Sequence, residues 1–359
     1  ARRHRAVAKI DKDLEAALKQ NASDLHFLSG DPVRARVHGE LKVLMDEVIT
    51  VDEVKECLLE IMDGTTQRAF DADDAADFAY DMPEVSRFRV NAFRHLNGLG
   101  AVLRAIPSKA LSLEDLNMPD VVHQLCRHTQ GMILVTGKTG SGKSTTLAAM
   151  IDAMNRRMKG HILTIEDPVE FVHKAQGCLI SQREVGVHSE SFADALHSAL
   201  REDPDVILVG EMRDLETISI AVTAAEMGIL VMGTLHTNGA GQTVDRIVNS
   251  FPADKQGHIR TMISTSLRGV ISQQLLPTKQ HAGRVAALEI LINTPAVSNL
   301  IRQGKLDQLE TAMQSGRGLG MQSMDTALMD MVSKGVISGK DAYLQANNKS
   351  KFERMKDET

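Results

Sequence analysis

Gly137-Lys138-Thr139-Gly140-Ser141-Gly142-Lys143-Ser144 is the stretch that decides the fold, because it matches the phosphate-binding pattern GxxxxGK[ST]. The apolar run Met132–Val135 precedes it and a helical pattern over Lys143–Arg157 follows, as such a loop requires. Glycines let backbone N–H groups turn toward phosphate oxygens, and the helix start favours negative charge. We expect Lys143 to reach the β- and γ-phosphates of a nucleotide and Ser144 to ligate Mg²⁺. The predicted phosphate-binding residues are Gly137, Thr139, Gly140, Ser141, Gly142, Lys143, Ser144 and Thr145.

Three more short apolar runs follow the loop without alternating polar residues. They are Ile162–Ile165, Val206–Val209 and Ile229–Leu235. Runs of this kind are typical of strands that are buried on both faces of a parallel sheet. Helix-like segments at Phe192–Leu200 and Leu215–Met227 separate them. The sequence therefore predicts an α/β domain with helices on both faces of a parallel sheet, and mainly helices beyond about residue 255.

An acidic residue ends the run Val206–Val209, because Gly210-Glu211 follows it directly. In a phosphate-binding fold of this type, a neighbouring strand delivers a carboxylate beside the γ-phosphate and its metal. We expect Glu211 to orient or deprotonate the attacking water and to contact Mg²⁺ through water. The alternative is an acid at a strand end that pairs with Arg213.

Polar residues also follow two other predicted strands. Glu166, Asp167 and Glu170 come after Ile162–Ile165, and Pro168 fixes a turn that could aim Glu170 at the site. An ordinary acidic turn remains the alternative. His236 follows the run that ends at Leu235, where it is either a γ-phosphate sensor or a core or capping residue.

The first 106 residues have a different, α+β pattern. Period-two alternation in Arg87–Asn91 puts Arg87 and Arg89 on one face of a strand, and the next strand-like run, Ala101–Ile106, carries Arg104. A solvated strand face is the alternative reading of these arginines. Residues 107–112 have no periodicity, so we predict a linker there and a second domain over residues 113–359.

Composition excludes several classes of protein. The 359 residues carry a net charge of −6, and residues 1–110 alone contain 16 basic and 19 acidic side chains, which disfavours nucleic acid as a partner. The three cysteines, Cys57, Cys126 and Cys178, form no CxxC pair, which excludes a four-cysteine zinc site and fits a reducing cytosol. The apolar runs are far shorter than the roughly 20 residues of a membrane span, so we expect no direct membrane insertion.

Several segments together resemble the secretion-type ATPases of type IV pilus and type II secretion machines, and most of all the type IV pilus retraction ATPase (PilT) family. The resemblance covers nearly the whole chain. It lies in Ser23–His26, in Gly137–Thr146 as a Walker A motif, in Ile165–Glu170 as an Asp box, in Gly210–Asp214 as a Walker B motif, in Gly233–Thr237 as a His box, and in Ala296–Lys305. The chain departs from the family at Ile229, where a His is usual, and at Ser298, where an Arg is usual.

The resemblance implies a small PAS-like domain over residues 1–106, a RecA-like ATPase domain over residues 113–359, and a homo-hexamer that hydrolyses ATP with Mg²⁺ to retract pili. It assigns catalysis to Glu170 and Glu211. It further implies that arginines of the first domain complete the nucleotide site when the domains close, namely Arg87, Arg89 and Arg104, and that Arg246 adds another.

The same resemblance implies a cytoplasmic protein that is peripheral at the inner face of the membrane, where it acts through an inner-membrane pilus platform protein. Alternatives are a pilus or type II secretion assembly ATPase, against which the missing zinc cysteines argue, and an accessory retraction ATPase that acts with a second motor. A nucleic-acid translocase is disfavoured by the charge balance.

Overall fold

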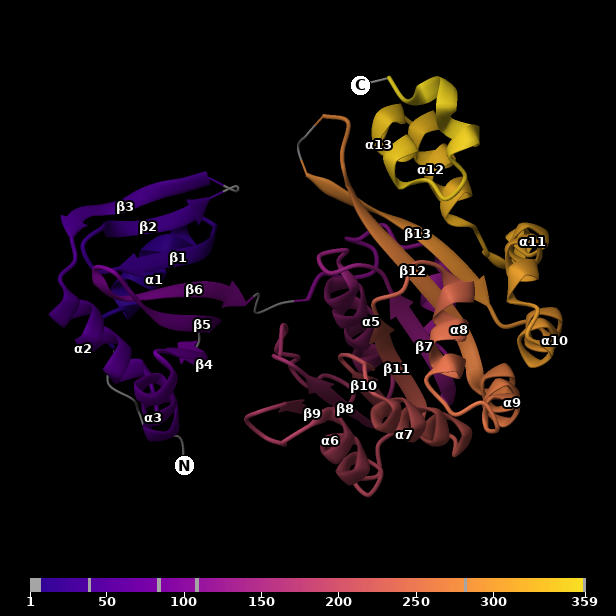
Figure 1. Cartoon of the computed structure of the whole chain (residues 1–359), viewed down its shortest axis with the longest axis horizontal. Coiled ribbons are helices and arrows are strands. Elements are labelled where there is room, and N and C mark those ends of the chain that lie inside the picture. The colour runs from indigo at the N-terminus through magenta and orange to yellow at the C-terminus, as the bar shows by residue number, and fades with distance from the viewer. Residues whose placement is uncertain (1–7, 38–39, 83–84, 107–109, 281–282, 358–359) are drawn as a thin grey trace. The chain divides into compact units, whose positions relative to one another are not determined.

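The computed structural model describes residues 8–37, 40–82, 85–106, 110–280 and 283–357, and divides into two compact units, 1–109 and 110–359 (Figure 1). Residues 107–109 of the predicted linker lie outside the described residues. Within the described ranges, none of the helices combines the length and apolar character that a membrane span requires.

The first unit is built on one six-stranded antiparallel sheet in the order β3-β2-β1-β6-β5-β4. Its strands are β1 (Ala22–Leu28), β2 (Pro32–Val37), β3 (Glu40–Val48), β4 (Ala75–Met82), β5 (Ser86–His95) and β6 (Gly98–Ile106). Its helices are α1 (Asp11–Lys19), α2 (Val51–Ile61) and α3 (Gly64–Asp73). Local chemistry explains these boundaries: Thr50 and Glu53 form a reciprocal capping box that starts α2. The core of this unit includes Phe88 and Val90, which alternate with exposed or half-buried residues on β5.

The second unit contains a seven-stranded sheet in the order β13-β12-β7-β11-β10-β8-β9. Its strands are β7 (Gly131–Thr136), β8 (His161–Glu166), β9 (Leu179–Glu184), β10 (Val206–Val209), β11 (Leu230–Leu235), β12 (Leu267–Pro277) and β13 (Arg284–Ile292). All neighbouring pairs are parallel except β12 and β13, which form an antiparallel hairpin. The predicted parallel sheet is confirmed, and its central strands, β7, β10 and β11, are fully buried, as their continuous apolar runs indicate.

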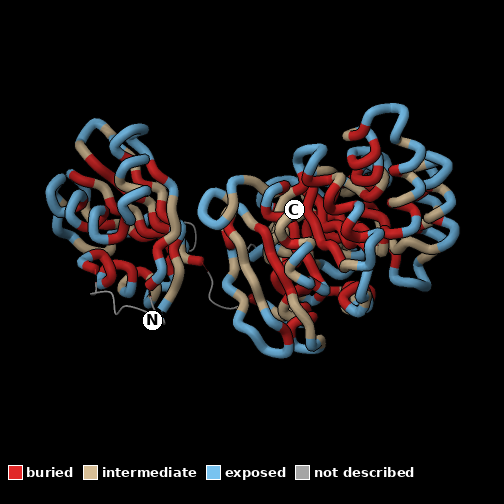
Figure 2. The backbone as a smooth tube through the Cα atoms, turned by 90° about the horizontal axis from the view of Figure 1, so that it is seen from below, coloured by how far each residue is buried: buried red, intermediate tan, exposed pale blue. Residues whose placement is uncertain are grey.

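Helices cover both faces of this sheet. Residues of α4 (Asp120–Leu125) and α5 (Lys143–Arg157) pack on one face, and residues of α6 (Phe192–Ala199), α7 (Leu215–Glu226), α8 (Ala240–Asn249) and α9 (Gln256–Ser266) pack on the other. Figure 2 shows that the buried backbone lies in the interior of this unit and the exposed segments around it. The site that the sequence predicts lies at the carboxyl edge of the central strands, where the loops before α5 and α8 begin.

The expectation of mainly helices beyond about residue 255 is wrong for β12 and β13, which extend the sheet next to β7. The error has a physical cause: Ser272 and Gln273 lie on opposite faces of β12 and both are buried, so polar residues interrupt the apolar pattern on both faces. The remaining segments are helical, and they are α10 (Pro295–Gln303), η1 (Leu306–Gln308), α11 (Leu309–Ser315), η2 (Arg317–Leu319), α12 (Met324–Ser333), α13 (Gly339–Gln345) and η3 (Lys349–Met355).

Candidate active site

The phosphate-binding loop joins the end of β7 to the start of α5, as predicted. Gly137, Gly140 and Gly142 have φ angles of +143°, +78° and +88°, which side chains with a Cβ rarely adopt. A Cβ at Gly137 would also lie 2.3 Å from the carbonyl oxygen of Gln273, so the close approach of β12 requires glycine there. The loop therefore has the tight, glycine-dependent turn that directs backbone N–H groups toward an anion.

Gln273 on β12 supports the phosphate-binding loop through hydrogen bonds of its side chain. The sequence did not predict this residue as part of the site. Its side-chain Nε2 donates to the carbonyl of Ser141 at 2.7 Å, and its Oε1 accepts from the hydroxyl of Thr146 at 2.8 Å. The residue is only 3% exposed. One side chain thus joins the loop to the first turns of α5, and no local sequence signal connects residues that lie 127 to 132 positions apart.

Lys143 folds back over the loop and donates to the carbonyls of Gly137 and Lys138 at 2.9 and 3.1 Å. Burial holds the pKa of its ammonium group below the usual 10.5, although the negative charges of Glu211 and Glu170 act in the opposite direction. These influences place both predicted catalytic carboxylates within electrostatic reach of the lysine.

Glu211 and His236 lie side by side at the ends of β10 and β11. The His236 Nε2 and Glu211 Oε1 atoms are 2.9 Å apart, and Arg213 contacts the same carboxylate oxygen. Two hydrogen bonds hold the strand ends together: the Thr234 hydroxyl donates to the carbonyl of Gly210 at 2.5 Å, and the Met212 N–H donates to the carbonyl of Thr234 at 3.0 Å. The structure therefore contains both the ion pair with Arg213 and a neighbouring imidazole, and the Glu211 side chain keeps 17% of its surface exposed.

Glu166 and Glu170 occupy different environments after β8. Glu170 is exposed, and its backbone N–H lies 3.4 Å from the carboxylate of Glu166. Burial raises the pKa of Glu166, although hydrogen bonds from Thr164 at 2.6 Å and Gln182 at 3.2 Å act in the opposite direction. Of the two glutamates, Glu170 is therefore the one that is accessible to a ligand, and Asp167 between them is also exposed.

The other predicted site residues of the second unit lie on two helices, α5 and α8. Ser144 and Thr145 lie half-buried in the first turn of α5. Arg246 lies exposed on α8, and within the described ranges no hydrogen bond or ion pair joins its side chain to the phosphate-binding loop.

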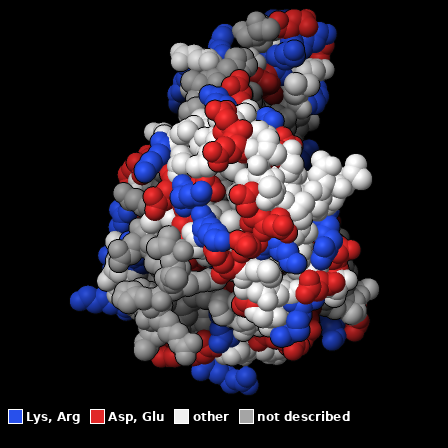
Figure 3. All heavy atoms as spheres, turned by 90° about the vertical axis from the view of Figure 1, so that its left-hand side faces the viewer, with Lys and Arg blue, Asp and Glu red and all other residues white. Residues whose placement is uncertain are grey.

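The three predicted arginines of the first unit lie on β5 and β6 and contact acidic residues. Arg87 is 3.5 Å from Asp81, Arg89 is 4.0 Å from Asp77, and Arg104 is 2.8 Å from the buried Asp24. Arg89 on β5 and Arg104 on β6 are direct cross-strand partners, so their side chains lie next to each other on the same face of the sheet. Acidic and basic side chains are also intermingled on the face drawn in Figure 3.

Comparison with known proteins identifies the family. Residues 3–344 match the family described as "Type II/IV secretion system protein". The chain is 50% identical over 343 residues to the type IV pilus retractation ATPase PilT of Pseudomonas aeruginosa, covering 96% of this chain and 99% of that protein. The chain belongs to the PilT family. A second member, the twitching motility protein of Neisseria gonorrhoeae, is 51% identical over 87% of this chain and 84% of its own length.

A solved member of the PilT family also has the same fold. The crystal structure of the pilus retraction motor PilT with bound ADP matches with a TM-score of 0.91 and 43% identity, over 97% of this chain and all of that one. The expected RecA-like fold of the second unit is thereby confirmed, and the family assignment made from the motifs is confirmed with it.

Proposed function

We propose that this PilT family member is an Mg²⁺-dependent ATPase whose hydrolysis of ATP powers type IV pilus retraction and twitching motility. One observation carries the proposal: beside a glycine-dependent phosphate loop that leads into α5, the neighbouring strand ends place His236 Nε2 2.9 Å from Glu211 Oε1. The names of the relatives, a pilus retractation ATPase and a twitching motility protein, support the retraction role.

The loop suits the phosphates of a nucleotide. Phosphate oxygens would replace the two carbonyls that Lys143 now contacts, and the Ser141 hydroxyl, which is buried without a hydrogen-bond partner among the described residues, gains an acceptor. The half-buried Ser144 hydroxyl and the Glu211 carboxylate are hard oxygen donors of the kind that Mg²⁺ prefers, with Glu211 acting through water. When bound, Mg²⁺ neutralises charge on the phosphates.

We assign the chemistry to the carboxylates at the strand ends. Glu211 accepts a proton from the attacking water, and His236, whose Nε2 lies 2.9 Å from Glu211 Oε1, senses the γ-phosphate and orients that carboxylate. Glu170 assists from the neighbouring strand end. The arginines of the first unit, Arg87, Arg89 and Arg104, stabilise the charge on the transferred phosphoryl group when the domains close, since guanidinium groups suit phosphate oxygens.

We propose further that the protein works as a homo-hexamer in the cytoplasm, peripheral to the inner face of the membrane, and that it transmits motion to an inner-membrane pilus platform protein. We assign Arg246 to the nucleotide site of the assembled ring. Coupling of hydrolysis to motion requires that ATP and ADP have different affinities for the closed and open arrangements of the domains.

Replacement of Glu211 by Gln tests the catalytic assignment. The variant keeps the shape of the side chain but lacks a base, so phosphate release should fall by about 100-fold or more while ADP binding is retained. Glu190→Gln, an exposed acid of the same unit, is the matched control and should leave hydrolysis unchanged. Hydrolysis by Glu211→Gln at the wild-type rate would remove Glu211 from the mechanism.

Deletion of the gene tests the biological direction of the motor. Retraction predicts surplus surface pili together with loss of twitching. Loss of the pili themselves would instead identify an assembly ATPase.

A further inference from the structure

Glu289 on β13 is a buried carboxylate that bridges two backbone segments far apart in the chain. Its Oε1 accepts from the N–H of Ala240, the first residue of α8, at 2.8 Å. Its Oε2 accepts from the N–H of Met324, the first residue of α12, at 3.2 Å. The side chain is 4% exposed, so these bonds are shielded from water. Because both partners are helix N-termini, the negative charge is favourably placed toward both helices.

The first of these segments is the loop that carries His236. Gly239, which precedes α8, provides no side-chain cap, and Glu289 takes over that role from the neighbouring strand. The N–H of Gly239 donates to the hydroxyl of Ser272 at 2.8 Å, and Ser272 is the direct cross-strand partner of Glu289. A Cβ at Gly239 would lie 3.2 Å from the Glu289 carboxylate, so the loop packs closely on it. The β12–β13 hairpin therefore holds the far end of the His236 loop.

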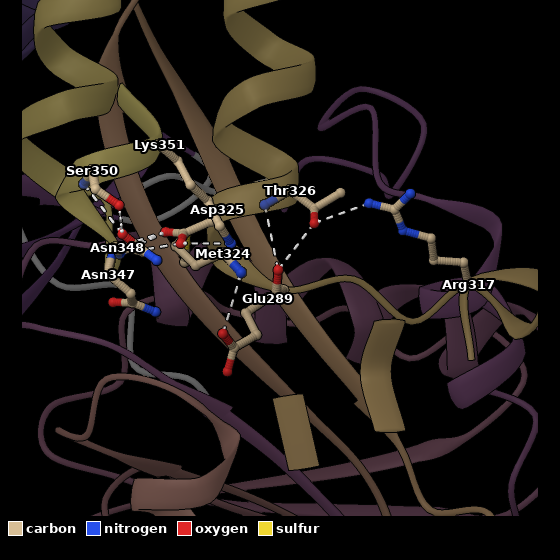
Figure 4. Close-up of polar contacts among 10 residues, drawn as sticks. Glu289, Arg317, Met324, Asp325, Thr326, Asn347, Asn348, Ser350 and Lys351 are labelled. Atoms are coloured by element: carbon tan, nitrogen blue, oxygen red, sulfur yellow. Dashed lines mark hydrogen bonds and ion pairs between the residues drawn. The ribbon is translucent and has the colours of Figure 1, made fainter. Parts of the chain in front are cut away.

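The second segment leads into the C-terminal helices. Residue 322 pairs with Ile290 in an isolated antiparallel bridge, so the chain that enters α12 runs beside β13. The next acid, Asp325, is also buried and accepts from the N–H groups of Asn347 and Asn348 at 2.8 and 3.1 Å, while Lys351 lies 3.5 Å away (Figure 4). Polar contacts and the single backbone step from Met324 to Asp325 thus link the His236 loop through Glu289 to the last helical segment.

We infer that Glu289 is a positioning residue that couples the His236 loop to the C-terminal helices over residues 323–351. The inference rests on the proposed nucleotide-sensing role of His236. If the loop shifts at Ala240, Oε1 of the buried Glu289 carboxylate must move with it to keep its hydrogen bond. Oε2 of the same carboxylate is bonded to the N–H of Met324, so the start of α12 is affected as well. The two N–H groups cannot move independently without leaving one of them unsatisfied in a buried site, which is costly.

Two variants of the full-length protein separate coupling from simple helix capping. Glu289→Gln keeps the size of the side chain but has a single acceptor oxygen, so only one of the two N–H groups can be bonded. Glu289→Asp keeps the negative charge but is one methylene shorter, so it cannot span both partners. Glu310→Gln, an exposed acid whose charge acts on Glu289, is the matched control.

Amide hydrogen exchange with and without ADP and Mg²⁺ provides the decisive measurement. In the wild type and in Glu310→Gln, nucleotide should change protection at residues 137–144, 237–243 and 323–351. In both Glu289 variants the response at 137–144 should persist and the response at 323–351 should disappear. We also expect kcat to fall about tenfold with KM for ATP within about twofold, because the residue acts through His236 and not through the phosphate loop.

The outcomes are distinguishable. If the wild type shows no protection at residues 137–144, the proposed nucleotide site is wrong and the coupling fails with it. If that protection is present but residues 323–351 do not respond, or respond equally in the Glu289 variants, the coupling alone is refuted. If Glu289→Asp keeps the full nucleotide-dependent change in protection at residues 323–351, the coupling through two carboxylate oxygens is refuted, and Glu289 contributes only negative charge at the helix ends.

Discussion

Replacement of Gln273 by Leu should weaken nucleotide binding without unfolding the protein. Leucine fills a similar volume but can form neither the bond to the Ser141 carbonyl nor the bond to the Thr146 hydroxyl. The Thr146 hydroxyl can turn to a carbonyl one helical turn earlier, so most of the cost falls on the Ser141 carbonyl. A buried polar group left without a partner costs about 1–3 kcal/mol, and both losses together amount to about 2–3 kcal/mol.

This cost should appear mainly in the affinity for nucleotide, because Ser141 belongs to the loop that must close around phosphate. An increase of 2–3 kcal/mol corresponds to a Kd that is about 30- to 150-fold higher. Titration of the purified protein with ADP and Mg²⁺ by isothermal calorimetry measures it directly. Denaturant unfolding of the same sample shows whether the fold is intact.

Gln274→Leu is the matched control for this prediction. It makes the same chemical change one residue later, on the opposite face of β12, where the side chain is half-buried and makes no hydrogen bond to the phosphate loop within the described ranges. We expect its Kd to stay within about threefold of wild type. A folded Gln273→Leu protein with wild-type affinity would show that the loop holds its shape without β12, and the reasoning would be refuted.

Three further predictions concern both units. Lys143→Ala should abolish measurable ATP hydrolysis and weaken ADP binding in calorimetry, because the variant lacks the ammonium group that donates to the phosphate oxygens. Unchanged ADP binding would contradict the assignment of Lys143. His236→Ala should lower kcat about tenfold or more with little change in ADP affinity, and an equal loss in both quantities would place the imidazole in binding instead. The first unit should lose stability in acid: burial tends to raise the pKa of Asp24, but hydrogen bonds from Ser23 and Arg104 outweigh it and hold the pKa below 3.8. The ionised Asp24 therefore stabilises the first unit fully above about pH 4, and this stabilisation is lost as pH falls through the lower folded-state pKa. In denaturant unfolding at a series of pH values, Arg104→Ala should move the loss of stability to higher pH. An unchanged pH dependence would refute the pairing of Arg104 with Asp24.

Much of the second unit could be predicted because its signals are local. Continuous apolar runs marked β7, β8, β10 and β11, and the phosphate loop fixed the order of strand, turn and helix. Because the carboxyl ends of parallel strands meet at one edge, an acid after Val209 and a histidine after Leu235 were expected near the same ligand. The 2.9 Å contact between Glu211 and His236 follows from the adjacency of β10 and β11.

The β12–β13 hairpin could not be predicted in the same way. Gln273 and Glu289 are polar residues in buried positions, and the bonds that make such burial favourable come from Ser141, Thr146, Ala240 and Met324. Those partners lie between 35 and 132 positions away in the sequence. A local pattern therefore shows only interrupted hydrophobicity, and tertiary contacts decide that the segment is a strand.

The pairing of Ser272 with Glu289 has a consequence for how this protein can change in evolution. Side chains alternate between the two faces of a strand, so inserting or deleting one residue in β12 would exchange the faces of Ser272 and Gln273. The support of the phosphate loop and the anchor of the His236 loop would then be lost in one event. Length variation among relatives should consequently be confined to the tip of the hairpin, between Pro277 and Arg284, while the number of residues from Ser272 to Pro277 and from Arg284 to Glu289 should stay fixed.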